Sequence, residues 1–381
     1  MRMTMTAQKD YNQTGEQAPI PQKKCDNWYH EEYFVDALVR ERKRTGRTCK
    51  SLWLMLVDID AIQDSHIKKQ ITRKMSEVLA LLTRDTDIKG WYRQNAVLGV
   101  IFTETNGVDP GLLRKKIEAG ICRAVPPWHR ELIALRFHVF PEHGEKAQAV
   151  ASADLTLYPD MEREKRSRRV SFALKRTLDI VGSVAGLILF SPLFVVIPLA
   201  IKCSSKGPVL FRQERVGQFG KRFQFLKFRS MQVNNDASVH RDYLAKFIKG
   251  KAGAEEGGNS GTKVYKLTND SRVTPIGKIL RKTSMDELPQ FLNVLRGEMS
   301  LVGPRPPIPY EVMEYDIWHW RRIIEIKPGI TGLWQVKGRS TTTFDEMVRL
   351  DLQYAREWSV WQDIKLLLQT PGAVLRGKGA C

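Results

Sequence analysis

The sequence contains few cysteines, and none of the five forms a C-x-x-C pair. This scatter argues against a disulfide framework and a zinc site, and it is typical of a reducing compartment. The N-terminal stretch MRMTMTAQKDYNQTGEQAPIPQKK has no apolar core and therefore lacks the pattern of a signal peptide. Acids are also in the minority, with 42 against 61 lysines and arginines and a net charge of +19. That excess predicts a polyanionic partner: nucleic acid, an anionic membrane surface or phosphorylated small molecules.

Nucleic acid is the partner class that the sequence supports least. No helix-turn-helix, RRM or zinc-finger pattern is present, so only the net charge points to it. An apolar stretch at 180–201 would have no use in such a protein. We therefore expect no nucleic-acid partner.

That apolar stretch, IVGSVAGLILFSPLFVVIPLAI, is the only one in the sequence that is apolar enough for a membrane, and it has no charged residue. As one straight helix it would rise about 33 Å, which is enough to cross a bilayer core. Ser191 and Pro192 interrupt it near the middle, because proline removes a backbone hydrogen bond and clashes with the preceding turn. Basic residues flank both ends, and the positive-inside rule associates such flanks with the cytoplasmic side. We favour a re-entrant helix over 178–202, with a spanning helix as the alternative.

Residues 46–145 have the pattern of a separate α+β domain. The expected order is a strand at 51–60, a helix at 68–83, two strands in 87–105, a helix at 109–125 and a strand at 132–141. This order predicts a ferredoxin-like module and resembles the nucleotide-cyclase-like fold of GGDEF domains. YRQNAV stands where those domains have their glycine-acidic signature. We interpret the module as a degenerate, non-catalytic regulatory or dimerisation domain, with a homodimer as one candidate assembly.

The segments on either side of this module are polar. Residues 1–45 are predicted to be a disordered or irregular tail, and 146–170 a basic linker. Farther on, the Gly- and Ser-rich end of 234–263 predicts a mobile loop or lid. The segment 343–377 predicts amphipathic helices, which either lie in the membrane interface or pack on the domain core.

The stretch TSMDELPQ puts two carboxylates side by side, Asp286 and Glu287, in this basic chain. One interpretation is structural: Ser284 and Glu287 fit a capping box at the start of a helix. The other is chemical. Asp286, held ionised by the helix dipole and by neighbouring cations, could attack phosphorus, and Glu287 could bind Mg²⁺.

Five cations, most of them in the turn-forming segments KFRS, LVGPRPP and VKGRS, are candidates for binding substrate phosphate. They are Lys227, Arg229, Arg281, Arg305 and Arg339. Arginine's planar fork suits bidentate binding of phosphate, and tight turns fix a side chain or expose backbone N–H groups. Each cation alone is equally well explained as a solvated surface charge. Together with the acid pair, they fit a site that binds an anionic diphosphate.

Five blocks follow in order between about residue 170 and the C-terminus: KRTLDIVGSVAGLILFSPL, GPVLFRQERVGQFGKRFQFLKFRSM, RKTSMDELPQFLNVLRGEMSLVGPRP, KPGITGLWQVKGR and DLQYAREWSVWQDIKLLLQT. This stretch resembles the bacterial sugar transferase family, the monotopic phosphoglycosyl transferases. The resemblance implies an α-heavy monotopic membrane catalytic domain over 171–381, with a re-entrant helix-break-helix and few short strands. It places the chain at the bacterial inner membrane, on the cytoplasmic face and in contact with lipid.

The resemblance also implies an activity and roles for single residues. Family members transfer sugar 1-phosphate from a UDP-sugar to polyprenyl (undecaprenyl) phosphate, release UMP and start exopolysaccharide, O-antigen or glycan assembly. Asp286 matches their nucleophile, which forms an aspartyl-phosphosugar intermediate, and Glu287 matches their Mg²⁺ ligand. Ser191 and Pro192 match the break in the re-entrant helix, and Arg305 matches the arginine of the Pro-Arg-Pro block. A non-catalytic scaffold that binds anionic lipid is the alternative.

Overall fold

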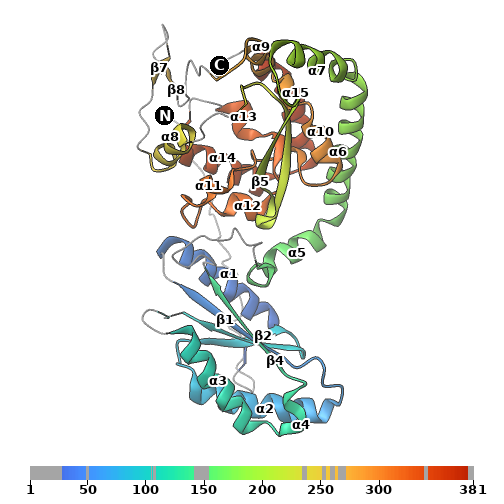
Figure 1. The fold of residues 1–381 in the computed structure, drawn as a ribbon. Helices are drawn as coiled ribbons and strands as arrows, with labels where there is room; N and C mark the ends of the chain where they lie inside the picture. The colour runs from blue at the N-terminus through green and yellow to red at the C-terminus, as the bar shows by residue number, and fades with distance from the viewer. Residues whose placement is uncertain are drawn as a thin grey trace, which may run out of the picture. The chain divides into compact units, whose positions relative to one another are not determined.

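The structure is a computed structural model that describes residues 28–48, 51–103, 105, 109–140, 154–233, 238–250, 255–257, 262–264, 272–338 and 342–375. The chain divides into two compact units (Figure 1). The first is built from Met1–Phe34, Met55–Ile101 and Val108–Arg136. The second comprises Val35–Leu54, Phe102–Gly107 and Phe137–Cys381.

A four-stranded sheet dominates the N-terminal part of the chain. Its elements are α1 (Glu31–Thr48), β1 (Leu52–Asp58), α2 (Ser65–Leu82), β2 (Ile88–Arg93), β3 (Val97–Phe102), α3 (Pro110–Ala124), α4 (Pro127–Arg130) and β4 (Ala134–Phe140). The strands lie in the order β2-β3-β1-β4. The predicted succession of strands and helices is confirmed, with the short α4 in addition. The ferredoxin-like assignment and the regulatory role stay predictions.

The first unit is held together by apolar strands and the inward faces of helices. β3 is buried along its whole length, and Met75 and Leu79 of α2 turn toward the interior. Asn95, at the turn between β2 and β3, adopts a left-handed backbone with φ of 56°. Asparagine tolerates this conformation better than most residues, so it suits the turn.

The prediction of an irregular tail up to residue 45 is wrong for residues 31–45, which belong to α1. Phe34 and Leu38 of this helix are fully buried. A charged stretch of this kind has a weak apolar pattern, and burial of one helix face stabilises it in the folded chain. Residues 1–27 lie outside the described part.

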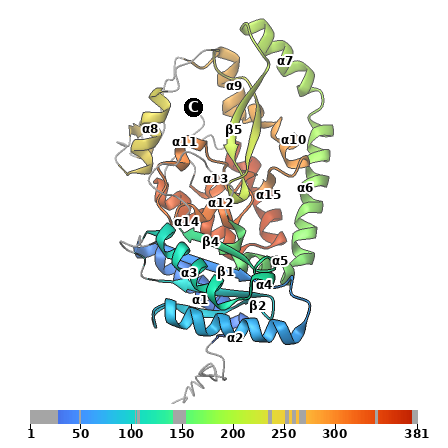
Figure 2. The same cartoon turned by 60° about the horizontal axis from the view of Figure 1, so that its bottom comes forward.

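Part of the predicted basic linker 146–170 is helical. After η1 (Leu155–Leu157) come α5 (Pro159–Ser167) and then α6 (Arg169–Leu189). α7 (Leu193–Ser204) follows α6, and the two are bent by 61° at the break between them (Figures 1 and 2). The break falls at Ser191 and Pro192, where the proline was expected to interrupt the helix.

Of the helices in the described residues, none has by itself the length and apolarity that a membrane crossing needs. α6 and α7 meet that requirement only when taken together, by length and composition. Apolar side chains are exposed on both helices: Ile180, Val181, Val184, Ile188, Leu189, Val195, Val196 and Leu199. The re-entrant placement of this pair in a membrane stays a prediction.

The remainder of the second unit is helix-rich with a few short strands. Its strands are β5 (Leu210–Val216), β6 (Arg222–Phe228), β7 (Glu255–Gly257), β8 (Thr262–Val264), β9 (Ser300–Val302) and β10 (Gly329–Thr331). Its helices are η2 (Gln218–Gly220), α8 (Ser238–Ile248), α9 (Pro275–Thr283), η3 (Met285–Glu287), α10 (Gln290–Leu295), α11 (Pro309–Val312), α12 (Arg321–Glu325), α13 (Leu333–Lys337), α14 (Phe344–Glu357) and α15 (Val360–Leu375). β5 and β6 form an antiparallel hairpin, and β9 and β10 pair in parallel. Within the segment 234–263, the structure describes α8, β7 and the start of β8, whereas 234–237, 251–254 and 258–261 lie outside the described residues. A mobile lid stays a prediction.

The C-terminal helices pack on the core through one side only. Trp358 and Leu366 are buried in the cluster that also holds Tyr354 and Leu301. Trp361 and Leu368, in contrast, are 71% and 75% exposed. Core packing therefore accounts for the inward face of α15, and its outward face is open to another surface.

Buried polar contacts fasten α6 to the core. The ammonium of Lys175 donates to Asp363 Oδ2 (2.8 Å) and to the carbonyl of Val302 (3.0 Å). Asp179, one turn further along α6, accepts hydrogen bonds from Ser300 Oγ and Leu301 N, both at 2.8 Å. Since Lys175 and Asp179 each contact residues of β9, the position of this strand is coupled to that of α6.

Replacement of Lys175 by methionine is expected to destabilise the second unit, because it leaves Asp363 buried without its cation. Breaking a buried ion pair from one side costs about 3–5 kcal/mol. The urea-unfolding midpoint of the full chain in detergent measures this loss. Lys221→Met changes an exposed lysine and serves as control, with an expected effect within about 0.5 kcal/mol. Equal midpoints for the two variants would show that the Lys175 contacts do not hold α6.

Candidate active site

Asp286 and Glu287 lie on η3, a single turn between α9 and α10. Ser284 ends α9 in a left-handed conformation with φ of 57°, and its N–H donates to the carbonyl of Arg281. A non-glycine residue in this region is uncommon and is typical of strained functional turns. The Ser284 side chain makes no capping hydrogen bond, so the predicted capping box is wrong.

The acid pair is positioned by the elements packed around it. η3 contacts both α9 and β6. Asn293, a fully buried residue of α10, donates to the carbonyl of Gln224 (2.7 Å), and its Oδ1 accepts from Leu226 N (3.1 Å). These bonds fix the start of α10 to β6, the strand that also carries Lys227.

Three of the predicted phosphate-binding cations surround the acid pair. The Lys227 ammonium lies 3.9 Å from Asp286 Oδ2. The charges of Arg281 and Arg305 act on the same carboxylate, and that of Arg305 also acts on Glu287. Asp286 is only 6% exposed, whereas Glu287 is partly exposed. The structure thus brings together acids and bases that lie up to 78 positions apart in the sequence.

Burial dominates the electrostatics of these groups. It raises the pKa of Asp286, against the cations Lys227, Arg281 and Arg305. Burial, together with the charge of Asp286, raises the pKa of Glu287 to about 7. Burial also lowers the pKa of Lys227, against the attraction of Asp286. The neighbouring cations act in the expected direction, since each of them lowers the pKa of Asp286, but desolvation outweighs them and the net shift is upward. That Asp286 is held ionised stays a prediction.

Arg305 is the exposed residue of an otherwise buried segment, Pro304–Pro307. The carbonyl of Pro304 accepts from Gly329 N (2.8 Å), and that of Pro307 accepts from Val216 N (2.9 Å). Gly303 and Gly329 let two backbones approach closely, since a Cβ on Gly303 would lie 2.2 Å from the Lys327 carbonyl oxygen. The loop is thereby tied to β5 and β10, and it presents one arginine.

Of the other two predicted cations, Arg229 has a different role. The Arg229 guanidinium donates to the carbonyls of Ser205 (2.8 Å) and Lys206 (2.9 Å). It therefore caps the C-terminal end of α7 and joins it to the residue after β6. Arg339 lies outside the described residues.

The family model for bacterial sugar transferases matches residues 170–377, which is more than half of this chain. The chain belongs to the bacterial sugar transferase family. It is 47% identical over 208 residues to a galactosyl transferase, CpsE, of Streptococcus agalactiae, covering 54% of this chain and 43% of that one. It is 38% identical over 216 residues to the exopolysaccharide production protein ExoY of Rhizobium meliloti, covering 56% of this chain and 90% of ExoY.

A third relative is the UDP-glucose:undecaprenyl-phosphate glucose-1-phosphate transferase of Escherichia coli. It is 43% identical over 214 residues, which are 53% of this chain and 40% of that one. The chain thus spans less than half the length of two of these three relatives. All five sequence blocks lie within the matched transferase region, as do Asp286, Glu287 and Arg305.

The donor set of the transferase site fits a divalent cation. Within the described residues no third acidic, histidine or cysteine side chain joins the pair to make a complete protein cage. Mg²⁺ needs no such cage, because it is usually held by one or two carboxylates together with substrate phosphates and water. A bound cation would also lower the pKa values of the two adjacent acids, which burial raises.

Buried polar residues that hold the Arg305 loop cannot be recognised from the local sequence. Arg322 forms an ion pair with Asp351 (2.9 Å), and Arg215 donates to the carbonyl of Pro306 (2.8 Å). Arg215 and Pro306 are 91 positions apart. No local pattern marks such contacts, since each residue reads as an ordinary surface charge until the fold buries it.

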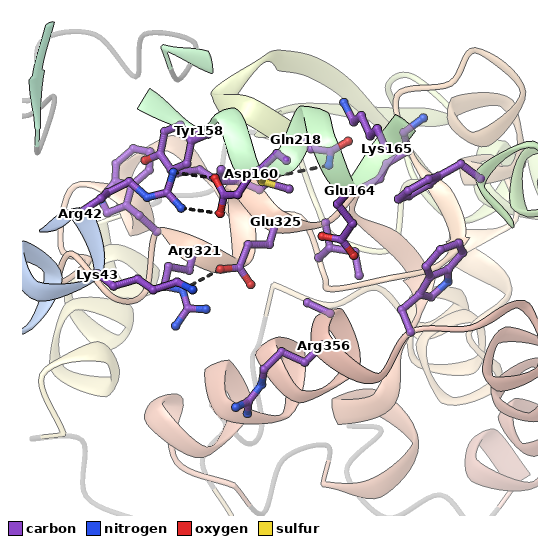
Figure 3. A pocket seen from close by; sticks show the side chains of 18 of the residues that line it. Arg42, Lys43, Tyr158, Asp160, Glu164, Lys165, Gln218, Arg321, Glu325 and Arg356 are labelled. Carbon is purple, nitrogen blue, oxygen red and sulfur yellow. Dashed lines mark hydrogen bonds and ion pairs between the residues drawn. The ribbon is translucent and has the colours of Figure 1, made fainter. Parts of the chain in front are cut away.

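A cavity of about 1170 Å³ in the second unit lies elsewhere, and neither Asp286 nor Glu287 lines it. Figure 3 shows its charged lining, including the Arg42 guanidinium facing the Asp160 carboxylate. Tyr158 and Lys165 also line it. Lys227, Arg281 and Arg305 do not line it either, so it is separate from the candidate site.

A methyl group at Gly303 is expected to disturb the Arg305 loop. Gly303→Ala forces the loop away from the Lys327 carbonyl, and overpacking of this kind costs about 1–3 kcal/mol. Thermal unfolding of the full chain measures the change. Gly46→Ala is the matched control, because the nearest atom to its Cβ would lie 3.7 Å away and alanine favours the helix. Equal stability of the two variants would contradict the close approach of the backbones.

Proposed function

We propose that the transferase domain moves a sugar 1-phosphate from a UDP-sugar to a polyprenyl phosphate and releases UMP. The observation that carries this proposal is the acid pair of buried Asp286 and partly exposed Glu287, on which the charges of Lys227, Arg281 and Arg305 act. The names of the relatives indicate galactose and glucose as transferred sugars and undecaprenyl phosphate as the acceptor. The product would initiate the assembly of an exopolysaccharide, O-antigen or other glycan.

In the first step, Asp286 acts as the nucleophile. One of its carboxylate oxygens attacks the phosphorus that bears the sugar and forms an acyl phosphate. The bond between that phosphorus and the bridging oxygen breaks, and UMP leaves with the electron pair. Lys227, Arg281 and Arg305 offset the negative charge of the diphosphate and of the leaving group.

In the second step, an oxygen of the polyprenyl phosphate attacks the same phosphorus. The acyl phosphate bond breaks, the polyprenyl diphosphate-sugar is formed and the carboxylate of Asp286 is regenerated. Burial favours this two-step route, because a desolvated carboxylate is a stronger nucleophile than a hydrated one. The approach of a second anion requires the same cations that hold the first.

Glu287, with Asp286 as its neighbour, would hold Mg²⁺ together with the substrate phosphates. The ion, when bound, neutralises charge on the transferred phosphoryl group. Glu287 itself must be ionised to serve as a ligand. Its raised pKa makes this dependent on the positive charges of Arg305, Lys227 and Arg215.

The acceptor lipid calls for a site at a membrane. We assign α6 and α7 as a re-entrant pair that enters one leaflet at the bacterial inner membrane from its cytoplasmic face. The exposed apolar side chains of both helices and the 61° bend support this placement. Arg229 ties the end of α7 to β6, and Ile197 of α7 packs in one cluster with Phe228 of β6 and Leu280 of α9. The bend therefore lies close to the elements around the acid pair.

The N-terminal module would then be an α+β regulatory or dimerisation domain of ferredoxin-like type. Its strand order β2-β3-β1-β4 and its two longer helices support this assignment. Its role is separable from the chemistry, because the residues assigned to catalysis all lie in 170–377.

The nucleophile assignment predicts that Asp286→Asn lowers UMP release by about 10⁴-fold or more, as loss of a catalytic nucleophile does. Purified protein in detergent is supplied with undecaprenyl phosphate and, in parallel reactions, UDP-galactose or UDP-glucose. Intact-mass spectrometry without acceptor should detect a sugar-phosphate adduct on the wild type and none on the variant. Asp242→Asn, in an exposed position on α8, is the control and should retain both signals.

Two results would contradict this mechanism. Full activity of the Asp286→Asn protein would exclude the covalent route. Binding of anionic vesicles without release of UMP from any UDP-sugar would favour the membrane-surface scaffold instead.

Removal of divalent cations is expected to abolish UMP release, with recovery on addition of Mg²⁺. Glu287→Gln should raise the Mg²⁺ concentration needed for half-maximal activity about 10-fold or more, because a carboxylate ligand is lost. Glu357→Gln, at an exposed position on α14, provides the control. Unchanged activity in the presence of a chelator would rule out the metal assignment.

A further inference from the structure

Two buried guanidinium groups donate hydrogen bonds to successive carbonyls of the Arg305 loop, Pro304–Pro307, which we also call the proline loop. Arg322 Nη2 donates to the carbonyl of Arg305 (3.0 Å), and Arg215 Nη1 donates to the carbonyl of Pro306 (2.8 Å). Together with the backbone donors to Pro304 and Pro307, four consecutive carbonyls accept hydrogen bonds from other elements. Proline lacks an N–H, so these carbonyls are the main polar handles by which the fold can fix the segment.

The two arginines differ in how their charges are satisfied. Arg322 has a carboxylate partner in Asp351 and a second contact to Tyr315 Oη (3.3 Å). Arg215 has no carboxylate at ion-pair distance in the described part of the chain, and its Nε has no hydrogen-bond partner there. Its other contact is with the ring of Phe225, 5.1 Å from the guanidinium carbon.

Arg215 is an unfavourable residue to bury for stability alone. It is 5% exposed, and burial together with the charge of Arg305 lowers its pKa to about 10. The charge of Glu311 offsets part of this shift. A buried cation without a carboxylate at ion-pair distance costs free energy that a hydrophobic residue of similar size would not. Such exceptions concentrate at functional sites. The charge of Arg215 also acts on Glu287.

The position of Arg215 has two consequences for Arg305. The hydrogen bond to Pro306 fixes the backbone next to Arg305. The repulsion between the two guanidinium groups disfavours conformations in which the Arg305 side chain folds back toward β5. Both effects favour an Arg305 side chain that extends away from the loop, where the structure shows it exposed.

We propose that Arg215 is a positioning residue of the transferase, which holds the Arg305 side chain ready to bind the diphosphate of the UDP-sugar. The inference rests on the proposed function for the identity of the substrate. It assigns to Arg215 no direct contact with that substrate, and it explains why an unpaired cation is kept inside the domain. A displacement of about 1 Å in a binding group can lower a rate about 100-fold.

A double-mutant cycle with Arg305 tests this coupling. Arg215→Met should lower kcat/KM for the UDP-sugar about 10–100-fold in the wild-type background, with most of the loss in KM. In an Arg305→Ala background the same change should lower it less than about 2-fold, because the group that it positions is already gone. Arg222→Met, an exposed arginine of the same hairpin that pairs with Glu214, is the control and should leave kcat/KM unchanged.

Arg215→Lys provides the second variant. It keeps the charge and one donor, so it should recover part of the loss seen with methionine. If Arg215→Met shows no cooperative thermal unfolding, the cycle is run with Arg215→Lys in place of it. Equal losses in the two backgrounds, or full activity of a folded Arg215→Met protein, would overturn the proposal.

Binding of UDP, measured by calorimetry on the same variants, separates this inference from the transfer reaction. An inactive wild type that binds UDP would count against the proposed function. The cycle is then evaluated on the Kd for UDP, where the same non-additivity is expected. Additive effects on that Kd would overturn the role of Arg215 even if the reaction stands.

Discussion

The removal of two adjacent carboxylates from water is the constraint around which the second unit is built. Loss of hydration raises the pKa of both Asp286 and Glu287, and the charge of Asp286 raises that of Glu287 further. Cations from three separate segments, Lys227, Arg281 and Arg305, offset part of this cost. A site with so many unsatisfied charges is stable only in a rigid frame, and it is ready to bind a ligand that carries both phosphate and a divalent cation.

The frame is provided by buried polar contacts that run from the apolar helices to the site. Lys175 and Asp179 join α6 to β9. Directly after β9 comes the proline loop with Arg305, whose backbone is held by β5, α12 and β10. A movement of the helix pair relative to the core would therefore be transmitted to the loop. In a reaction between a soluble nucleotide and a lipid, this connection would align the two substrates.

Much of the framework could be predicted from local pattern. Alternating and helical periodicity placed the strands and helices of residues 46–145, and proline chemistry placed the break at Ser191 and Pro192. The helix at 31–48 was missed, because its charged sequence has little apolar pattern and its stability depends on the buried contacts of residues such as Phe34. The capping box at Ser284 was wrong, because the serine ends one helix instead of starting the next.

By itself, the sequence determined which chemistry is available: an acid pair in a basic chain, one apolar stretch with a break and arginines next to proline and glycine. These features are local, since they depend on residue type and spacing. The tertiary structure alone decided which cations face the acids. It directed Arg229 to the end of α7, buried Arg215 without a carboxylate at ion-pair distance and made desolvation outweigh the cations in the pKa of Asp286. Desolvation and long-range contacts cause all three, and neither is encoded in any short segment.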